Sequence, residues 1–363
     1  MRSEQDSGLG VREPEDRATG SEGRDAAPRS PVGAVVADLT EHELIARIRA
    51  RMPPAPAWMV VGIGDDAAVV EPERNRLAVL SVDALVDGVH FDRAFTPPAA
   101  IGHRALAANL SDLAAMGAEP RLALLSLALP GAFPVADFDA MIDGLTALAA
   151  RHRLHVAGGN LTRSPGPLVI DVTVMGTVKR RRALLRGGAR PGDELYVSGT
   201  IGAAAAGLQM LRAGLEIGTS MARVTGRYLY PEPRVRLGSM LGRNRAASAC
   251  MDLSDGLGDA VRQIAEASGV GAVIAAGELP IDQDARRWFE SRGADAVHEA
   301  ITGGDDYELL AAVRPRTRSR LAAARRHGAV PLTHIGTCTA DRALVLRHAG
   351  GDRPMPRGYT HFR

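Results

Sequence analysis

The sequence predicts a two-domain protein of the α/β (α+β) class. Its 363 residues are more than one compact core of ordinary size holds, and 45% of them are hydrophobic, which is enough for globular domains. Short apolar runs alternate with segments of helical periodicity along the chain. A connector that contains Gly and Pro, residues 186–192, interrupts this alternation near the middle. We therefore expect one domain at residues 38–185 and a second at residues 186–363.

The first 37 residues differ in composition from the rest of the chain. Residues 1–37 are rich in Arg, Glu, Asp, Gly, Ser and Pro and contain almost no large apolar side chains. Such a segment cannot bury enough surface to offset the entropy lost on ordering, so we expect a disordered tail. Ordered structure should begin with a helix at residues 39–48, for which Thr40 is a suitable N-cap.

Strands and helices are then expected in alternation through the first domain. Residues 77–82 and 122–129 are short apolar runs typical of buried strands. Residues 97–116 lie between them and predict a helix, with a proline near its start and a glycine just past its end. A second helix is expected at residues 135–150. Residues 168–178 alternate apolar and polar side chains, which predicts a strand with one solvent-facing side.

The second domain continues the mixture of strand and helix. Residues 194–198 predict a strand that leads through two glycines into an Ala-rich helix. A further helix is expected at residues 257–267, and a polar turn at residues 302–306. A final pair of strands should precede Gly358, close to the end of the chain.

Charge and cysteine content limit the classes of function. The formal net charge of +2 gives no electrostatic reason to expect a nucleic acid or a membrane surface as partner. Two cysteines, Cys250 and Cys338, are too few for a disulfide framework or a multi-cysteine zinc site. No apolar run approaches the roughly 20 residues that span a bilayer, and the N-terminus lacks the apolar core of a secretory signal. We expect a cytoplasmic protein.

Aspartates recur at the ends of the expected strands and helices. These residues are Asp65, Asp66, Asp83, Asp87, Asp112, Asp252, Asp255, Asp305 and Asp306. Each motif alone is more simply explained as a turn residue or a helix cap. Asp112 is the exception, because a carboxylate near a helix C-terminus faces the negative end of the dipole and needs a cation partner.

The aspartates together favour a magnesium site. Carboxylates that converge repel one another unless cations neutralise them. Oxygen ligands without a His or Cys pattern are those that Mg²⁺ prefers, and phosphoryl transfer uses this ion to neutralise phosphate charge. The chain has no GxxxxGK[ST] phosphate loop. Phosphate could instead meet the backbone around Gly159, the helix start at Ser254, or Arg186. A solvated basic face is an equally good explanation of Arg186.

With these residues assembled, the sequence resembles the thiamine-monophosphate kinase family. The matching segments occur in the family's order along the chain, and nine short matches in sequence make a specific signal. They are GIGDDAAVV at 62–70, SVDALVDGVHF at 81–91, NLSDLAAMGAEP at 109–120, GGNLTRSPGPL at 158–168, RGGARPGD at 186–193, LYVSGTIG at 195–202, MDLSDGL at 251–257, GGDDYEL at 303–309 and GYTHF at 358–362.

The resemblance implies a fold, a reaction and a set of site residues. The implied fold is that of aminoimidazole ribonucleotide synthetase, with an ATP- and Mg-binding N-terminal domain that pairs in a homodimer. The implied reaction transfers the γ-phosphate of ATP to thiamine phosphate, with several Mg²⁺ ions as cofactors. The implied metal ligands are Asp66, Ser81, Val82 (through its backbone), Asp83, Asp112, Asn160, Asp252 and Asp255. The implied ATP contacts are Gly159, Asn160, Arg186 and Ser254, the thiamine phosphate contacts His90, Asp305 and Tyr359, and the catalytic residues Asp112, Asp255 and Arg186.

Two positions depart from the family's pattern. Asn160 stands where the family usually has Asp, so the metal affinity of that subsite should fall. Asp171, on the next strand, either compensates or is simply a solvated strand residue. Asp305 stands where the family usually has Glu, which keeps the charge on a side chain one methylene shorter.

Other functions remain open at this point. Selenophosphate synthetase and the hydrogenase-maturation dehydratase share the fold, but the first expects a reactive Cys near the N-terminus and the second a C-terminal Cys. Residues 1–249 contain no Cys, and the chain ends in Arg363. The alternative from another class is a nucleotide-binding regulator that has lost turnover, which Asn160 motivates.

Overall fold

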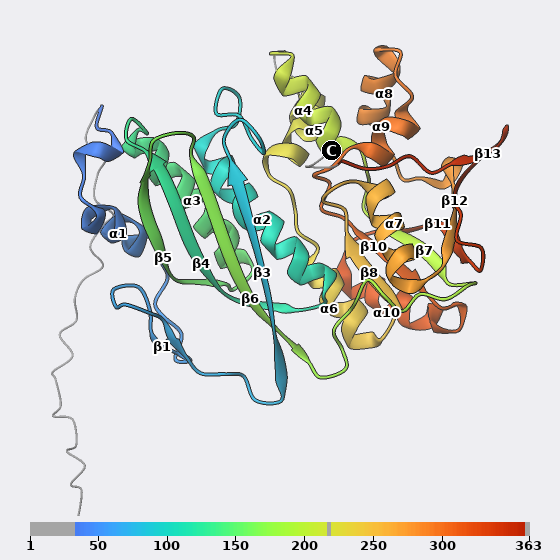
Figure 1. Ribbon diagram of the computed structural model, residues 1–363, viewed down its shortest axis with the longest axis horizontal. Helices are drawn as coiled ribbons and strands as arrows, with labels where there is room; N and C mark the ends of the chain where they lie inside the picture. The colour runs from blue at the N-terminus through green and yellow to red at the C-terminus, as the bar shows by residue number, and fades with distance from the viewer. Residues whose placement is uncertain (1–32, 216–218, 360–363) are drawn as a thin grey trace, which may run out of the picture.

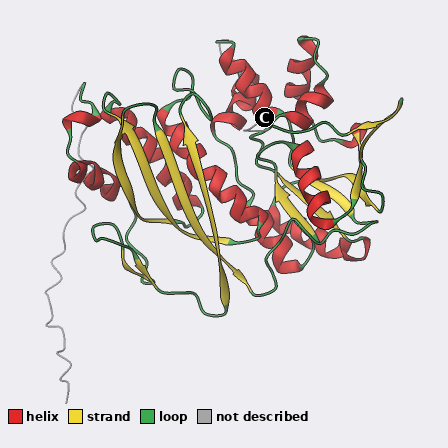
Figure 2. Cartoon of the chain, in the orientation of Figure 1, coloured by secondary structure: helices red, strands yellow, loops and turns green. Residues whose placement is uncertain are grey.

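The computed structural model describes residues 33–215 and 219–359. Two sheets with their helices lie side by side, one built by the N-terminal half of the chain and one by the C-terminal half (Figure 1). Helices and strands are mixed in both halves (Figure 2), so the expected α/β class with two domains is confirmed.

A four-stranded sheet forms the N-terminal half. Its strands are β3 (Arg76–Val86), β4 (Glu119–Pro130), β5 (His155–Ser164) and β6 (Val169–Lys179). The order across the sheet is β3-β6-β4-β5, with antiparallel neighbours except the parallel pair β4 and β5. The expected strands at 77–82, 122–129 and 168–178 are confirmed, whereas β5 was not predicted.

Two helices cover one face of this sheet. They are α2 (Pro98–Ala115) and α3 (Val135–Arg151), both close to their predicted bounds. The two helices touch at Gly102, where a Cβ atom would lie 1.8 Å from the backbone oxygen of Met141. The opposite face of the sheet carries no helix among the described residues (Figure 1).

The beginning of the described chain packs against this half. The predicted N-cap Thr40 starts α1 (Glu41–Ala50), and the Glu43 carboxylate accepts from the Thr40 backbone N–H at 2.7 Å. Val36, in a short 3-10 helix at Val36–Asp38, is buried, and its N–H donates to the Phe133 carbonyl. Structure is therefore present before residue 38, while residues 1–32 of the expected tail lie outside the described residues. A small hairpin, β1 (Met59–Val61) and β2 (Val69–Val70), follows α1.

A seven-stranded sheet forms the C-terminal half, in the order β13-β12-β9-β11-β7-β10-β8. Only β9 and β12 are parallel neighbours in it. The predicted strand at 194–198 and the final strand pair, β12 and β13, are confirmed. The bounds are β7 (Glu194–Ser198), β8 (Ala249–Asp252), β9 (Gly271–Ala275), β10 (Leu309–Val313), β11 (Leu332–Thr339), β12 (Leu344–His348) and β13 (Gly351–Pro354).

Helices surround the second sheet. The predicted Ala-rich helix and the helix at 257–267 correspond to α4 and α7. The bounds are α4 (Ala203–Arg212), α5 (Thr219–Leu229), α6 (Val235–Asn244), α7 (Leu257–Ser268), α8 (Gln283–Ser291), α9 (Ala296–Thr302) and α10 (Arg318–Gly328), with 3-10 turns at Ala276–Glu278 and Pro315–Thr317. None of the helices in the described parts of the chain is long and apolar enough to cross a membrane.

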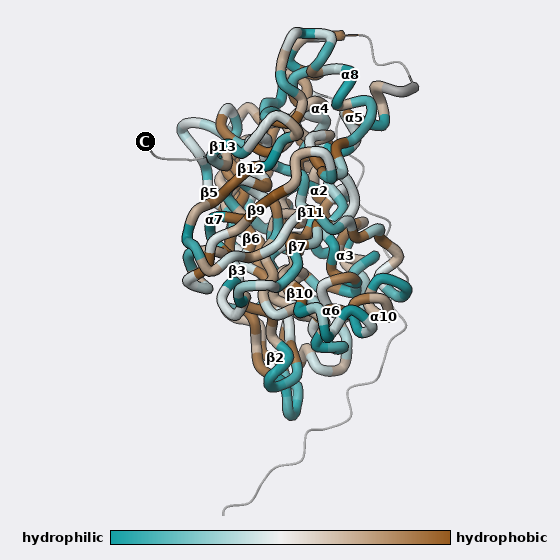
Figure 3. The backbone as a smooth tube through the Cα atoms, turned by 90° about the vertical axis from the view of Figure 1, so that its right-hand side faces the viewer, coloured by the Kyte–Doolittle hydropathy of each residue, from teal (hydrophilic) through white to brown (hydrophobic). Residues whose placement is uncertain are grey.

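The two halves share one hydrophobic core. Leu237 and Leu241 of α6 and Leu321 of α10 belong to the same buried cluster as Leu113 of α2. A Cβ atom on Gly238 would lie 1.9 Å from the Ala114 carbonyl oxygen, so α6 presses directly on α2. Hydrophobic segments run along central strands such as β9 (Figure 3). The predicted boundary at residue 186 lies in the loop between β6 and β7. Residues that precede this boundary nevertheless share a hydrophobic core with residues that follow it.

Candidate active site

A cleft of about 530 Å³ lies where the two halves meet. The N-terminal half lines it with residues from β3, from the loop after it and from α2, and the C-terminal half with the loops after β8 and α9. At least one residue from each predicted group, for metal, ATP and thiamine phosphate, lines this cleft. Those that line the cleft are Asp83, His90, Asp112, Asp252, Ser254, Asp255, Asp305 and Tyr359.

Three carboxylates converge at one end of the cleft. Asp83 lies in β3, Asp112 in the last turn of α2, and Asp252 at the end of β8. Burial raises the pKa of Asp83 to about 6, and the charges of Asp112, Asp171 and Asp255 add to the shift. Burial and the charge of Asp112 raise the pKa of Asp252 to about 7. These shifts show that the aspartates lie close enough to repel one another.

Serine hydroxyls orient two of these carboxylates. Ser81 donates to Asp112 Oδ2, and Ser111 Oγ donates to Asp252 Oδ2 at 2.7 Å. Burial raises the pKa of Asp112, while the Ser81 hydrogen bond and the charge of Arg186 oppose the rise. Arg186 itself donates to Gln263 Oε1 at 2.5 Å. The predicted groups Ser81, Asp83, Asp112, Asp252 and Arg186 are therefore neighbours in space.

The cluster matches part of what a magnesium site requires. No three His, Cys, Asp or Glu side chains within residues 33–215 and 219–359 come close enough to hold an ion by themselves. Magnesium is usually held by one or two carboxylates together with phosphate oxygens and water. The oxygen-only donors and their mutual repulsion fit an ion that arrives with a phosphate-bearing ligand.

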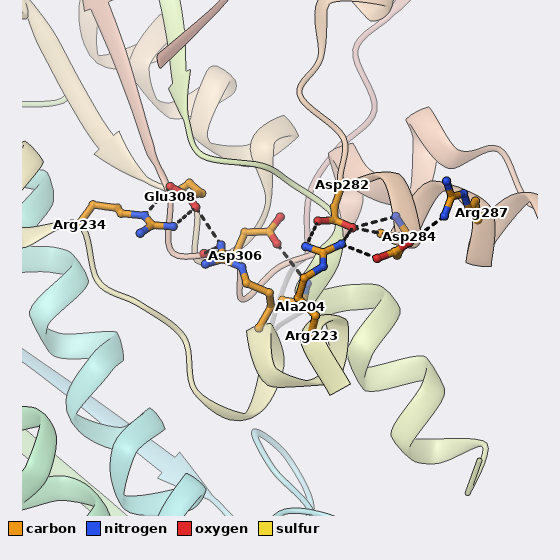
Figure 4. Close-up of polar contacts among 10 residues, drawn as sticks. Ala204, Arg223, Arg234, Asp282, Asp284, Arg287, Asp306 and Glu308 are labelled. Carbon is orange, nitrogen blue, oxygen red and sulfur yellow. Dashed lines mark hydrogen bonds and ion pairs between the residues drawn. The ribbon is translucent and has the colours of Figure 1, made fainter. Parts of the chain in front are cut away.

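The loop that carries Asp305 is anchored by alternate residues. Asp306 is buried and accepts from the Gly202 N–H at 2.7 Å and the Ala204 N–H at 3.2 Å, at the start of α4. Glu308 is fully buried and accepts from Arg234 Nε at 2.7 Å and from Arg227 Nη2 at 2.8 Å. Figure 4 shows Asp306 near Ala204 and Glu308 beside Arg234. Asp305 and Tyr307, which alternate with these anchors, line the cleft.

The same loop takes an unusual backbone path. Asp305 and Tyr307 have φ angles of 66° and 49°, in the left-handed region that side chains other than glycine rarely adopt. The Asp305 N–H donates to the Ser254 carbonyl at 2.7 Å, and the Tyr359 N–H donates to the Asp255 carbonyl at 3.0 Å. Three segments that are distant in sequence are thus joined by backbone hydrogen bonds beside the cleft.

Sequence reasoning missed several buried or half-buried charged residues of this site. Arg104 of α2 forms an ion pair with Asp305 at 3.1 Å, and Arg227 and Arg234 neutralise Glu308. Arg104 follows His103 in a mostly apolar helix, and periodicity alone does not distinguish a buried arginine from a solvated one. The GGDDYEL segment was recognised, but its anchoring residues were not separated from those that face the cleft.

Two predicted residues lie on the strand farthest from the cleft. Gly159 and Asn160 are in β5, at the edge of the sheet opposite β3 (Figure 1). Three strand spacings of about 4.8 Å separate β5 from β3, or about 14 Å. A Cβ atom on Gly159 would lie 1.8 Å from the Leu125 carbonyl oxygen, so the glycine is required for strand packing. Asn160 is exposed and pairs in register with Ser126 of β4.

Asp66 is also outside the cleft. It follows β1 in the β1–β2 hairpin, which packs through Met59 against Leu122 and Ala157 of the sheet. Asp66 is exposed, and its N–H donates to Asp65 Oδ1 at 2.8 Å. The Val82 side chain is 57% exposed on the open face of the sheet, which leaves only its backbone for the role that the resemblance implies.

Family models match both halves of the chain. Residues 64–178 match the model described as AIR synthase related protein, N-terminal domain, and residues 190–349 match AIR synthase related protein, C-terminal domain. The fold and the cleft thus define an AIR synthase-related protein with both domains of that class. A hydrogenase maturation protein, HypE, shows the same fold at 19% identity and a TM-score of 0.72.

Comparison with curated proteins identifies the family to which the chain belongs within this class. The chain is 40% identical over 327 residues to thiamine-monophosphate kinase of Escherichia coli K12, covering 89% of this chain and 98% of the relative. The Bacillus subtilis enzyme of that name is 34% identical over 313 residues, covering 84% and 94%. The chain belongs to the thiamine-monophosphate kinase family and is an enzyme of the kinase class.

Solved structures agree with this assignment. Thiamine-monophosphate kinase from Stenotrophomonas maltophilia K279a matches with a TM-score of 0.76 at 40% identity, over 85% of this chain and 96% of that one. AaThiL complexed with AMPPCP and TMP matches with a TM-score of 0.72 at 32% identity, over 83% and 92%.

Proposed function

We propose that this protein transfers the γ-phosphate of ATP to thiamine phosphate and so forms thiamine diphosphate. The observation that carries the proposal is that one cleft holds the carboxylate cluster and all three predicted acceptor contacts, His90, Asp305 and Tyr359. A structure of a family member in complex with AMPPCP and TMP, at 32% identity, supports the choice of both substrates.

Asp83, Asp112, Asp252 and Asp255 are the residues that would hold magnesium in this reaction. When bound, Mg²⁺ neutralises phosphate charge in the transition state. Ser81 and Ser111 fix the orientation of Asp112 and Asp252 before any ligand arrives, as outer-shell hydrogen bonds do at metal sites. The charge of Arg186 acts on both carboxylates, which supports its proposed role as a partner for a phosphate oxygen.

The chemistry of the acceptor phosphate determines which catalytic groups the protein has to supply. A phosphate monoester has a second pKa of about 6, so its attacking oxygen is already deprotonated at neutral pH. No general base is needed, and the residues of the cleft have to align the acceptor with the γ-phosphate. The Val86 N–H donates to His90 Nδ1 at 3.0 Å, so the His90 proton is on Nε2, where it can donate to the acceptor.

A homodimer is part of the same proposal. The open face of the four-stranded sheet exposes Leu80 (68%), Val82 (57%) and Leu124 (39%), and a second copy would bury these apolar side chains. In one protomer Asn160 lies about 14 Å from β3, too far to share an ion with Asp83, and Asp66 lies outside the cleft that Asp83 lines. We infer that they serve the cleft of the partner subunit, which would require the dimer for a complete site.

A single charged substitution on the open face of the four-stranded sheet tests whether the protein forms this dimer. Leu80→Asp should convert the protein to a folded monomer with greatly reduced kinase activity, as measured by light scattering after size-exclusion chromatography. Leu215→Asp places the same charge on another exposed leucine, away from the sheet, and should leave the assembly unchanged. A dimeric Leu80→Asp protein, or a fully active monomer, would refute this part of the proposal.

The two alternative enzymes that need a reactive cysteine, selenophosphate synthetase and the hydrogenase-maturation dehydratase, have little support. Cys250 and Cys338 are both buried, and burial raises the pKa of each thiol to about 12, so neither is a reactive thiolate. Both are free thiols, which suits a cytoplasmic location, where ATP is also available.

A direct assay tests the reaction. Purified protein is incubated with ATP, Mg²⁺ and thiamine phosphate, and thiamine diphosphate is followed by mass-resolved chromatography. We expect product that depends on all three components. ATP binding without any product would reject the kinase reaction and favour a nucleotide-binding regulator that has lost turnover.

A further inference from the structure

Arg104 is a buried arginine at the junction of the two halves. It lies in α2, and its side chain is 3% exposed. Nη2 donates to Asp305 Oδ2 at 3.1 Å and to the His90 carbonyl at 3.3 Å, and Nη1 donates to the Tyr228 carbonyl. The guanidinium carbon lies 3.9 Å from the centre of the Tyr228 ring. One side chain therefore contacts three segments that are far apart in the sequence.

The partners of Arg104 are also linked to other residues of the cleft near His90 and Asp305. The Tyr228 hydroxyl donates to the same His90 carbonyl, at 3.3 Å. The Tyr307 hydroxyl donates to Asp305 Oδ1 at 3.1 Å, so both carboxylate oxygens of Asp305 are engaged within the protein. His90 and Asp305, two of the three predicted acceptor contacts, thus share one arginine as a neighbour.

We propose that Arg104 is a positioning residue that sets the distance between His90 and Asp305 across the junction of the two halves. The proposal rests on the thiamine phosphate kinase activity proposed above. Arg104 also neutralises Asp305, which would otherwise repel the anionic acceptor phosphate near it. Asp305 in turn acts mainly by holding the loop through Arg104 and Tyr307.

The geometry explains why this residue is an arginine. The planar guanidinium donates in several directions from fixed positions and stacks on an aromatic ring, whereas a lysine ammonium offers a single point charge. The base of the loop is anchored separately, by Asp306 and Glu308. Loss of Arg104 should therefore release the loop at Asp305 without unfolding its base.

Steady-state kinetics of Arg104→Met test the proposal. We expect the KM for thiamine phosphate to rise about tenfold or more, while the KM for ATP changes less than about twofold. Arg104→Lys, which keeps a buried cation, should recover only part of the loss. Equal increases in both KM values, or no change in either, would overturn the proposal.

A matched control separates this role from the packing of the two halves. Arg151 of α3 also joins the halves, through an ion pair with Glu232 at 2.6 Å, but its side chain is 53% exposed and lies outside the lining of the cleft. Arg151→Met should leave both KM values unchanged. Asp305→Asn should reproduce the selective effect on thiamine phosphate, and the double variant with Arg104→Met should be no worse than the single ones. If the effects of the two substitutions on the KM for thiamine phosphate were additive, Arg104 and Asp305 would act independently and the proposal would be overturned.

A measurement without substrates keeps this test independent of the reaction. Backbone amides of residues 303–307 should exchange hydrogen faster in Arg104→Met than in the wild type, while those of β6 remain as protected as before. Unchanged exchange at 303–307 would overturn the positioning role. If the wild-type protein forms no thiamine diphosphate, the proposed function fails alone, and the exchange data still decide the role of Arg104.

Discussion

Ser111 donates to Asp252 across the junction of the two halves, from the last turns of α2 to the end of β8, at 2.7 Å. The hydrogen bond partly offsets the cost of burying a carboxylate whose pKa is raised by its surroundings. Ser81 does the same for Asp112 from the neighbouring strand. The two serines thus orient carboxylates of the cluster, and the proposed Mg²⁺ ion would relieve the repulsion between these carboxylates.

Removing one carboxylate should abolish turnover and leave the fold intact. Asp112→Ala takes away a central member of the cluster, so we expect kinase activity to fall to background. Because the loss also relieves repulsion with Asp252, the metal-free protein should be as stable as the wild type or more stable, by on the order of 1 kcal/mol. Activity and urea denaturation measure the two effects. Asp143→Ala, on the exposed side of α3, is the control. Near-normal activity of Asp112→Ala would remove Asp112 from the ligand set.

The stability of the metal-free protein should fall as pH rises, and the stabilisation that Mg²⁺ adds should increase. Asp83 and Asp252 have folded-state pKa values of about 6 and about 7, above the ordinary 3.8. The folded protein keeps protons that the unfolded chain has released, so the free energy of unfolding of the metal-free protein should decrease as pH rises from about 4 to 7. Mg²⁺ binds the deprotonated cluster and should raise Tm more at about pH 8 than at about pH 5.5.

Thermal denaturation with a chelator or with Mg²⁺ measures this dependence. Asp252→Asn should remove much of the difference between the two conditions. Asp306, whose pKa burial raises to about 7, contributes to the metal-free slope but lies among backbone donors of α4, so Asp306 should be indifferent to Mg²⁺. A Mg²⁺ effect of the same size at both pH values would contradict the proposed ligands.

The buried ion pairs of Glu308 should be essential for stability. Glu308→Gln leaves Arg227 and Arg234 without the carboxylate that neutralises them, and breaking a buried pair in this way costs about 3 kcal/mol. Urea denaturation measures the loss. Glu290→Gln breaks only a surface pair with Arg286 and should change the free energy of unfolding by less than about 0.5 kcal/mol. Equal effects of the two substitutions would show that the Glu308 network adds no stability.

Restoring the carboxylate at position 160 should ease the demand for metal. Asn160→Asp places a charge on the exposed face of β5, so we expect the Mg²⁺ concentration for half-maximal rate to fall. Thr162→Asp, two residues further along the same strand and also exposed, is the matched control and should have no effect. An unchanged requirement in Asn160→Asp would show that this subsite does not limit metal binding.

Local arguments singled out residues that the structure brings together in the cleft where they depended on the ends of helices and strands. Asp112 was singled out because a carboxylate near a helix C-terminus needs a cation, and it lies in the cleft beside Asp83 and Asp252. The strands and helices around it were predicted because their periodicity is a property of one segment. Asp112 and Asp252 lie at the ends of α2 and β8, and both meet Asp83, which lies within β3, at the junction of the sheets.

Features that depend on pairing between distant segments were not accessible from the sequence. The backbone around Gly159 was named as one place where phosphate could bind, and the structure shows that Gly159 lies in β5 and packs against the Leu125 carbonyl. The position of Asn160 follows from the strand order and register, which no local pattern encodes. Arg104 was overlooked for a similar reason, since its burial is decided by partners more than 120 residues away in the sequence.

The contact of α6 with α2 has a consequence for synthesis of the chain. Ala114 of α2 lies directly against Gly238 of α6, which comes more than 120 positions later in the sequence. A nascent chain that ends before Gly238 therefore presents an uncovered apolar helix face after its first sheet is complete. Translation must proceed through α6 and α10 before the first half can close its core, so the growing polypeptide needs protection from aggregation during that interval.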